Sequence, residues 1–208
     1  ADEHLPSMCG EGTCGACCAR VVSGSYVLGE HDAAVLGSSP APGTVLLCRT
    51  LPTGDCRVEL PYDRSRVLAE APPERTVTVT ELEVVAADTM RLLLTLVPDE
   101  RGMAAEFDPG QFIQVQVPGT DTLRAYSLAN CGNWDGVFEL FVRIQPSGLF
   151  STWLSTRAAV GDTLTIRGPQ GAFGIHESGL RPRWFIGGVT GIAPLLSMVR
   201  RMAEWGDP

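Results

Sequence analysis

Four of the seven cysteines in this 208-residue chain lie within ten residues, in the sequence CGEGTCGACC from Cys9 to Cys18. Cys9, Cys14 and Cys17 follow the spacing C-x4-C-x2-C, and Cys48 lies thirty-one residues beyond the third, in LLCRT. Three thiolates from a loop and a fourth from a distant segment form the ligand set of a plant-type [2Fe-2S] cluster. The spacing therefore predicts that Cys9, Cys14, Cys17 and Cys48 bind this cluster, with Cys48 at the edge of an apolar strand.

Glycines alternate with the cysteines of this loop, at Gly10, Gly12 and Gly15. Glycine allows the tight turns of a loop that wraps a compact anionic cluster, and it leaves backbone amides free to point at sulfur. Two other sites stay open: a structural zinc site, which more often has two C-x2-C pairs, and a redox-active thiol pair between a strand and a helix. The remaining cysteines are expected to be small buried apolar residues: Cys18, Cys56 and Cys131.

A second group of polar residues lies in RAYSLAN, from Arg124 to Asn130. In a strand, alternate side chains share a face, so Arg124, Tyr126 and Leu128 are expected on one face and Ser127 on the other. A guanidinium group matches a phosphate with paired hydrogen bonds, and a phenol offers a flat face with a polar end. An ordinary amphipathic strand has the same pattern, so these residues alone leave both interpretations open.

Two glycine-containing turns each precede a predicted helix. In PSGLFSTWL, Gly148 lies in the turn and Ser151 in the first helical turn, where free amides and the helix dipole favour an anion. A capped surface helix is the alternative. The sequence GGVTGIAP, residues 187–194, follows the apolar RWFI, and its glycines let amides approach a pyrophosphate. It is not the G-x-G-x-x-G dinucleotide pattern.

The composition is that of an acidic globular protein. The formal net charge is −8, the pI is near 4.9, and all sixteen basic residues are arginines. Such a charge disfavours nucleic acid and anionic membranes as partners, because both would be repelled. No apolar run is long enough to span a bilayer, and ADEHLPSM lacks the features of a signal peptide. A cytoplasmic protein is expected, where cysteines are more often ligands or catalysts than disulfides.

The elements that position these residues fall into three parts, and the fold class is predicted to be multidomain α+β. Residues 1–70 hold six cysteines, and 71–75, with two prolines, form a linker. Residues 76–180 contain short alternating or apolar segments that predict an antiparallel β-barrel. Residues 181–208 are predicted to be the first βα unit of a parallel α/β domain, with the strand RWFI and the helix IAPLLSMVRRMAEW.

The cysteine loop with LLCRT resembles plant-type ferredoxin domains. The further stretches ELPY, PGQF, PGTD, GPQGAFG and SMVRRMAEW extend the resemblance along the chain. In their order, they are similar to the NADH-dependent reductase components of bacterial multicomponent oxygenases, above all those of soluble methane monooxygenases. The resemblance implies a partial β-grasp ferredoxin domain, an FAD-binding barrel and the start of an NAD domain. It also implies that the chain is an internal part of a longer reductase.

The resemblance implies a role for each segment that could bind FAD. Arg124 would pair with a flavin phosphate, Tyr126 would lie against the isoalloxazine and Ser127 would hydrogen-bond near N5. The other residues implied to bind FAD are Leu128, Gly148, Phe150 and Ser151.

The resemblance also places NADH at GGVTGIAP. Thr190 would lie near the nicotinamide, and the flanking glycines implied to bind the cofactor are Gly187, Gly188 and Gly191. Tyr126, Ser127 and Thr190 are therefore the implied catalytic residues.

Electron counting gives the implied function. NADH donates two electrons and a [2Fe-2S] cluster accepts one, so FAD is needed between them. The implied acceptor is the hydroxylase component of an oxygenase, expected to be of the methane or alkane type. Residues 1–70 carry nine acidic residues and five arginines, a net charge of −4 that would suit a basic docking site. The alternatives are a reductase for a phenol, toluene or benzoate oxygenase, an iron–sulfur carrier or sensor, and a zinc-containing binding module.

Overall fold

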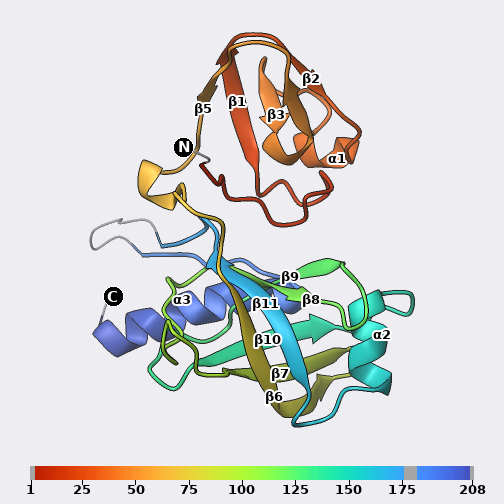
Figure 1. Cartoon of the computed structure of the whole chain (residues 1–208). Helices are drawn as coiled ribbons and strands as arrows, with labels where there is room; N and C mark the ends of the chain where they lie inside the picture. Colours follow the sequence, from red (N-terminus) through yellow and green to blue (C-terminus); the bar gives the residue numbers. More distant parts are fainter. Residues whose placement is uncertain (1–2, 176–181, 207–208) are drawn as a thin grey trace. The chain divides into compact units, whose positions relative to one another are not determined.

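The computed structural model describes residues 3–175 and 182–206 and divides the chain into two compact units, Ala1–Ala71 and Pro72–Pro208 (Figure 1). Each unit is described by itself. The division falls at the predicted linker, although the first strand of the second unit already begins at Glu74. The prolines at 72 and 73 precede this strand, where no ladder donor is required of them.

The first unit consists of two small antiparallel sheets with short helical turns. The three-stranded sheet has the order β3-β1-β5, and β2 pairs with β4. The elements of the first unit, in chain order, are β1 (Cys18–Ser23), β2 (Tyr26–Leu28), α1 (Ala33–Leu36), β3 (Thr44–Leu46), η1 (Leu47–Arg49), β4 (Thr50–Pro52), β5 (Arg57–Glu59) and η2 (Arg64–Arg66). His4 and Leu68 exchange two backbone hydrogen bonds, of 2.8 and 3.0 Å, which join the two ends of the unit.

The cysteine loop leads directly into this sheet. Alternate residues of β1, Ala19 and Val21, are buried and pack beside Val45 and Leu46 of β3. Cys48 was expected at the edge of a strand, but it lies in the 3-10 turn η1 that follows β3. The turn bends the chain back, since the Leu47 amide donates to the carbonyl of Cys17 at 3.1 Å. It therefore brings Cys48 to the loop that precedes β1.

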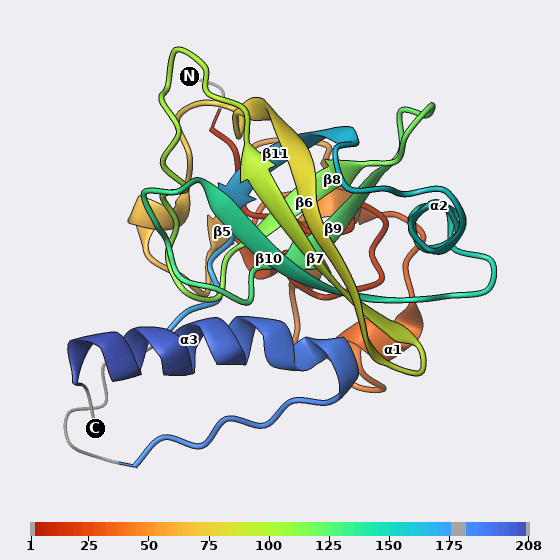
Figure 2. The same ribbon diagram turned by 90° about the horizontal axis from the view of Figure 1, so that it is seen from below.

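The second unit contains a curved six-stranded antiparallel sheet with the order β10-β7-β6-β11-β8-β9 (Figures 1 and 2). The predicted strand segments are confirmed as β6 (Glu74–Ala86), β7 (Thr89–Leu96), β8 (Phe112–Gln116), β9 (Leu123–Ser127), β10 (Val137–Arg143) and β11 (Thr163–Gln170). Alternation of side chains puts one face of each strand into a common core. Its fully buried members include Val79, Leu94, Ile113, Leu140 and Ile166.

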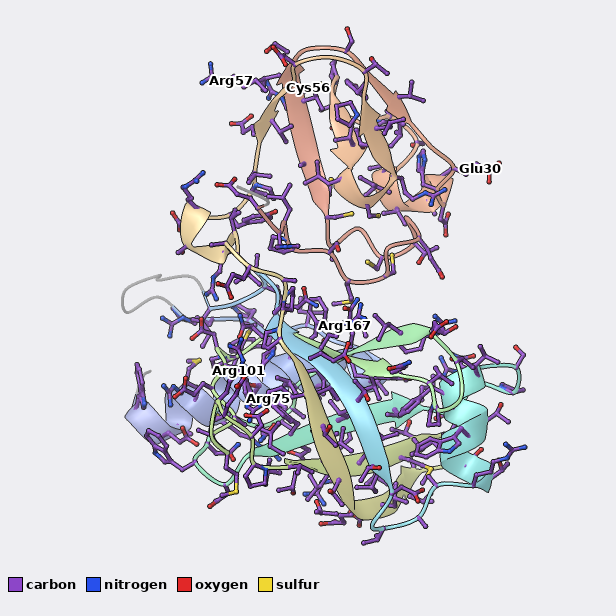
Figure 3. All side chains as sticks on the ribbon, viewed as in Figure 1. Glu30, Cys56, Arg57, Arg75, Arg101 and Arg167 are labelled. Carbon is purple, nitrogen blue, oxygen red and sulfur yellow. The ribbon has the colours of Figure 1, made fainter. Side chains whose placement is uncertain are left out.

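The edges of this sheet meet without forming a ladder. The strands β9 and β10 end the order, and the Ala129 amide just beyond β9 donates to the carbonyl of Glu139 in β10 at 2.9 Å. The Glu139 amide donates to the side chain of Asn130, also at 2.9 Å. The predicted antiparallel barrel is thus a curled sheet joined by these bonds. Near its start, Arg75 in β6 donates to Asp99 at 2.8 Å, and the Arg101 amide donates to the same carboxylate at 2.8 Å (Figure 3).

Two helices flank the sheet: α2 (Leu149–Thr156) and α3 (Ile192–Trp205), the latter preceded by the 3-10 turn η3 (Val189–Gly191). The helix predicted for IAPLLSMVRRMAEW is confirmed. The strand predicted for RWFI is wrong, because residues 182–188 have no strand conformation and Trp184 and Ile186 are about nine-tenths exposed. A strand forms only where a neighbouring strand pairs with it, and none of the described residues does so here.

Candidate functional site

The loop that carries three of the cysteines has the backbone its glycines predict. Gly10, Gly12 and Gly15 have φ angles of 69°, 75° and 73°, a region that disfavours other residues. A Cβ atom on Gly12 would lie 2.8 Å from the side chains of both Arg49 and His31, so glycine is needed there for space as well. The Gly12 carbonyl also accepts a hydrogen bond from the Asp32 amide at 3.2 Å.

The four predicted ligand thiols form two pairs. Cys17 Sγ lies 3.3 Å from Cys48 Sγ, and the Cys9 and Cys14 side chains are near enough for each to influence the pKa of the other. The amides of Glu11 and Thr13 donate to Cys9 Sγ, each at 3.4 Å. Within the described residues, no three His, Cys, Asp or Glu side chains converge on one point as ligands of a single ion would. The loop therefore presents two thiol pairs rather than one tetrahedral set.

Hydrogen bonds to sulfur decide which thiol ionises first. Burial alone would raise the pKa of Cys9, but donors on Thr13, Glu11 and Cys14 outweigh it and lower that pKa to about 6. Burial raises the pKa of Cys14, and its bond to Cys9 adds to this rise. Burial and the adjacent Cys17 raise the pKa of Cys48 to about 11. Donors to sulfur therefore favour the thiolate at Cys9, whereas burial favours the neutral thiol at Cys14 and Cys48.

All seven cysteines are free thiols, and three lie outside these pairs. Cys18 begins β1, paired with Leu46. Cys56 lies just before β5, at the end of the first unit that is opposite the cysteine loop (Figure 3). Its thiol donates to the Ser25 carbonyl at 3.2 Å. Cys131 is buried in the second unit. Burial was predicted for all three, and it is confirmed for Cys131 alone, since Cys18 and Cys56 are half-buried.

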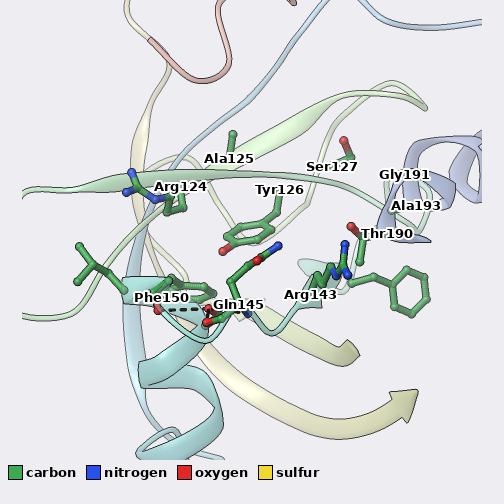
Figure 4. Close-up of a pocket in the computed structure, with 14 residues that line it drawn as sticks. Arg124, Ala125, Tyr126, Ser127, Arg143, Gln145, Phe150, Thr190, Gly191 and Ala193 are labelled. Atoms are coloured by element: carbon green, nitrogen blue, oxygen red, sulfur yellow. Dashed lines mark hydrogen bonds between the residues drawn. The ribbon is translucent and has the colours of Figure 1, made fainter. Parts of the chain in front are cut away.

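The second unit holds a cavity of ≈ 400 Å³ (Figure 4). It brings together eight residues that the sequence predicted for FAD or NADH: Arg124, Tyr126, Ser127, Gly148, Phe150, Ser151, Thr190 and Gly191. They come from β9, the start of α2 and the turn η3, three segments well separated along the chain. Gly187 and Gly188 do not line this cavity, and neither does Leu128. Leu128, just beyond the end of β9, is fully buried in the core cluster against which Tyr126 also packs.

An aromatic stack forms one wall of this cavity. The Tyr126 ring lies 5.3 Å from the Phe150 ring between centroids, and Phe150 lies 5.5 Å from Trp153. Burial raises the pKa of the Tyr126 hydroxyl well above its ordinary value, with Arg124 opposing the rise, so the phenol stays protonated. Ser127 points to the other side of β9 from Tyr126 (Figure 4). Both line the cavity because β9 is an edge strand.

The cavity lining also contains groups that attract anions. Arg124 and Arg143 both line the cavity, and so does the first turn of α2. Amides in the first turn of a helix have no partner within the helix, and they bring the positive end of its dipole. Arg143 is held by Asp88, whose carboxylate accepts from its Nε at 2.9 Å and has a lowered pKa because of that bond. The lining therefore offers positive charge and helix amides to an anionic ligand.

The loop before α2 is fixed by the hydroxyl of Ser151. Ser151 Oγ donates toward the carbonyls of Gln145 and Gly148, at 3.0 and 3.2 Å, and accepts from the Gln145 amide at 3.1 Å. A Cβ atom on Gly148 would lie 2.4 Å from this oxygen. The hydroxyl is therefore occupied by the loop itself, so Ser151 shapes the cavity and leaves ligand contacts to the backbone.

A further wall is the turn η3. Val189 has φ of 51°, a conformation that costs a β-branched residue about 1–3 kcal/mol and that is found most often at ligand sites. The next residue, Thr190, lines the cavity, and it also lines a neighbouring one of ≈ 690 Å³. The turn thus places a hydroxyl-bearing residue at the junction of two cavities.

Two known family models match separate parts of the chain. Residues 1–53 match the family described as the 2Fe-2S iron–sulfur cluster binding domain, and residues 76–175 match the oxidoreductase FAD-binding domain. The chain belongs to the proteins that join a 2Fe-2S cluster binding domain to an oxidoreductase FAD-binding domain. The methane monooxygenase component C of Methylosinus trichosporium is 37% identical over 100% of this chain and 62% of its own length. The propane 2-monooxygenase reductase component of Rhodococcus jostii is 35% identical over 98% of this chain and 55% of its own length.

Solved structures agree with this family. The crystal structure of a cytochrome P450 reductase from Amycolatopsis aligns with a TM-score of 0.68 at 35% identity. The alignment covers 97% of the present chain and 60% of the Amycolatopsis chain. The chain thus spans about three fifths of the length of its relatives. No helix in residues 3–175 and 182–206 is both long and apolar enough to cross a bilayer.

Two polar residues of the cavity lining were missed in the sequence. Arg143 lies at the end of β10, in FVRI, and Gln145 lies just beyond it. The sequence did contain a signal for Arg143, because it is a charged residue in the mainly apolar LFVRI that leads into PSGLF. Gln145 is recognisable only from the fold, which turns its side chain toward Tyr126 (Figure 4).

Proposed function

We propose that this chain is the cluster-binding and flavin-binding part of an NADH-dependent reductase that supplies electrons to an oxygenase. The observation that carries the proposal is the joint presence of two thiol pairs in one unit and an aromatic, cationic cavity in the other. A cluster and a flavin in one chain suit the conversion of a two-electron donor into single electrons.

The cysteine loop supports a [2Fe-2S] cluster held by Cys9, Cys14, Cys17 and Cys48. Two irons with two thiolates each require two pairs of sulfur atoms, which is how the thiols are grouped. Zinc requires four ligands around one centre, and the described residues do not show that arrangement. The amides aimed at Cys9 would stabilise the negative charge of the bound cluster and so influence its potential.

The cavity supports FAD, with Tyr126 against the ring system and Arg124 at a phosphate. Arg143 and the first-turn amides of α2, from Leu149 to Ser151, would complete the anion site. When bound, FAD accepts two electrons from a nicotinamide and releases them singly. Ser127 at the cavity edge is available to hydrogen-bond a ring nitrogen, which would orient the flavin.

NADH is assigned to the side of the cavity formed by η3. Thr190 would position the nicotinamide there, and Gly187, Gly188 and Gly191 would let backbone approach the dinucleotide. Gly187 and Gly188 lie outside the cavity itself, which suits a ligand that extends from the flavin toward the start of α3. Tyr126, Ser127 and Thr190 are the residues proposed to contact the reacting rings.

The proposed electron acceptor is the hydroxylase component of an oxygenase of the methane or alkane type. The methane and propane monooxygenase reductases among the relatives support this choice. We place the protein in the cytoplasm, where NADH is available and cysteine ligands stay reduced.

The proposal is tested by cofactor analysis and turnover of the full-length protein. We expect two irons, two acid-labile sulfides and one FAD per chain, with NADH-dependent reduction of an artificial acceptor such as ferricyanide. A colourless, zinc-containing protein would contradict the cluster. A flavin-free protein that does not oxidise NADH would contradict the reductase. Reduction of methane-type and aromatic-type oxygenase components then tests the partner.

A further inference from the structure

The carboxylate of Glu139 is buried between two arginines from different elements. Its side chain, in β10, is 5% exposed and accepts from Arg91 Nε in β7 at 2.6 Å. Its other oxygen accepts a short hydrogen bond from Arg200 in α3. Burial opposes ionisation, but the two guanidinium groups hold the pKa of Glu139 below its usual range. We name Glu139, Arg91 and Arg200 the Glu139 network.

The same stretch of α3 is fixed to the segment that follows β9. Arg200 donates to the carbonyl of Ala129 at 2.9 Å, and the fully buried Ser197 donates to the carbonyl of Asn130 at 2.6 Å. Asn130 in turn accepts from the Glu139 amide. The residues of α3 that face the sheet are therefore held by polar contacts as well as by apolar packing (Figure 2).

These contacts connect the two sides of the proposed reaction site. Asn130 lies three residues after Ser127, the last residue of the flavin-contacting strand β9. Ser197 lies two helical turns after Thr190, the residue assigned to the nicotinamide. The network also adjoins the flavin cavity, because the ≈ 690 Å³ cavity lined by Arg91, Glu139 and Arg200 shares Thr190 with it.

We propose that Arg200, through Glu139 and the Ala129 carbonyl, is a positioning residue that sets the distance between Thr190 and the flavin-binding strand. The inference rests on the proposed function and deepens it. Arg200 is not among the described residues that line the flavin cavity, so it acts through the placement of α3. The positive charge of Arg200 is needed for this role. The buried carboxylate of Glu139 keeps a fixed position only when the guanidinium groups that bond to it are fixed as well.

The direct test compares Arg200→Gln with Arg201→Gln in the full-length, FAD-loaded protein. Arg201 is the next residue of α3, and its ion pair and its ring contact are with Glu204 and Trp205 on the same helix. Flavin reduction by NADH is followed by stopped-flow absorbance, with FAD content measured alongside. We expect Arg200→Gln to keep its FAD and its KM for NADH while the reduction rate falls about ten- to hundredfold, because small displacements of reacting groups slow transfer by that much.

Conservative variants separate positioning from simple loss of structure. Arg200→Lys should recover part of the rate, and Glu139→Gln should slow reduction while Arg201→Gln should not. Combining Arg200→Gln with Glu139→Gln should add little to either single change, since the two residues act as one unit. Equal reduction rates in Arg200→Gln and Arg201→Gln would overturn the proposal. A rate loss fully explained by lost FAD would overturn it as well.

Amide hydrogen exchange distinguishes this proposal from the proposed function. In Arg200→Gln, the amides of residues 193–203 should exchange faster than in Arg201→Gln, whether or not NADH is oxidised. If the parent protein binds no FAD and does not oxidise NADH, the proposed function is refuted. The exchange data would then test only whether Arg200 docks α3 against the sheet. Unchanged exchange in Arg200→Gln would refute the positioning role.

Discussion

At the scale of single residues, Cys18 and Cys48 give opposite predictions. Cys48 Sγ lies 3.3 Å from Cys17 Sγ, whereas Cys18 is held in β1 opposite Leu46. We therefore expect Cys48→Ser to change or abolish the visible and EPR spectra of the cluster. Cys18→Ser should leave the spectra and the iron content unchanged, and it serves as the matched control. A normal spectrum in Cys48→Ser together with a lost one in Cys18→Ser would refute the ligand assignment.

The guanidinium group of Arg124, which lines the proposed flavin cavity, gives a second prediction. Arg124→Gln removes a charge from the cavity lining but keeps a polar side chain of similar length. Charge-assisted hydrogen bonds contribute about 1.5–3 kcal/mol, so FAD affinity should fall about ten- to hundredfold. Titration of the apoprotein with FAD by fluorescence measures this loss. Arg157→Gln, at the other end of α2, should bind FAD as the parent does, and equal affinities for all three proteins would contradict the assignment.

At the scale of elements, the turn before α2 gives a third prediction. Gly148→Ala would place a methyl group 2.4 Å from Ser151 Oγ, and overpacking of this kind costs about 1–3 kcal/mol. The free energy of unfolding from urea titration should fall accordingly. Removal of the hydroxyl relieves the clash, so Gly148→Ala combined with Ser151→Ala should be no less stable than Ser151→Ala alone. Additive losses would show that the clash is not the cause.

The docking of α3 gives a fourth prediction, on pH. The folded-state pKa of Glu139 is lowered, so its ion pairs stabilise the protein above the ordinary glutamate pKa of about 4.3. That contribution is lost as the pH falls through the lower folded pKa. Glu81 and Glu83, which also pair with Arg91, titrate nearby, so Glu139→Gln is the necessary reference. The difference in Tm between parent and Glu139→Gln should shrink in acid, and a constant difference would contradict the prediction.

The sequence predicted the elements whose signals are local. Cysteine spacing predicted the loop, alternating and apolar segments predicted strands in the second unit, and apolar periodicity predicted α3. Alternation put Leu128 on the face of Tyr126, but it does not tell whether the core or a ligand covers that face, and Leu128 lies in the core. RWFI failed because an apolar run becomes a strand only beside a partner. The Arg200 to Glu139 contact joins residues sixty-one apart, and no spacing rule brings them together.

At the scale of the whole molecule, the net charge is unevenly concentrated. Residues 1–70 carry a net charge of −4, from nine acidic residues and five arginines, so half of the total of −8 lies in about a third of the chain. The exposed Glu30 belongs to this unit (Figure 3). A cluster bound by four thiolates adds further negative charge. An acceptor that approaches the cluster therefore meets an acidic surface.

This charge gives the fifth prediction, on ionic strength. Electron transfer to a basic protein acceptor should slow severalfold as NaCl rises from about 0.05 to about 0.5 M, because the Debye length falls from about 14 Å to about 4 Å. Cytochrome c serves as the probe, with its reduction followed at saturating NADH. Reduction of FAD by NADH, measured separately by stopped flow, should vary much less, because it takes place in the other unit. Charge reversal at Glu30 and Glu59 to Lys should flatten the salt dependence. Equal salt dependence in parent and variant would show that the acidic unit does not steer the acceptor, and that the cluster meets its partner through apolar contacts.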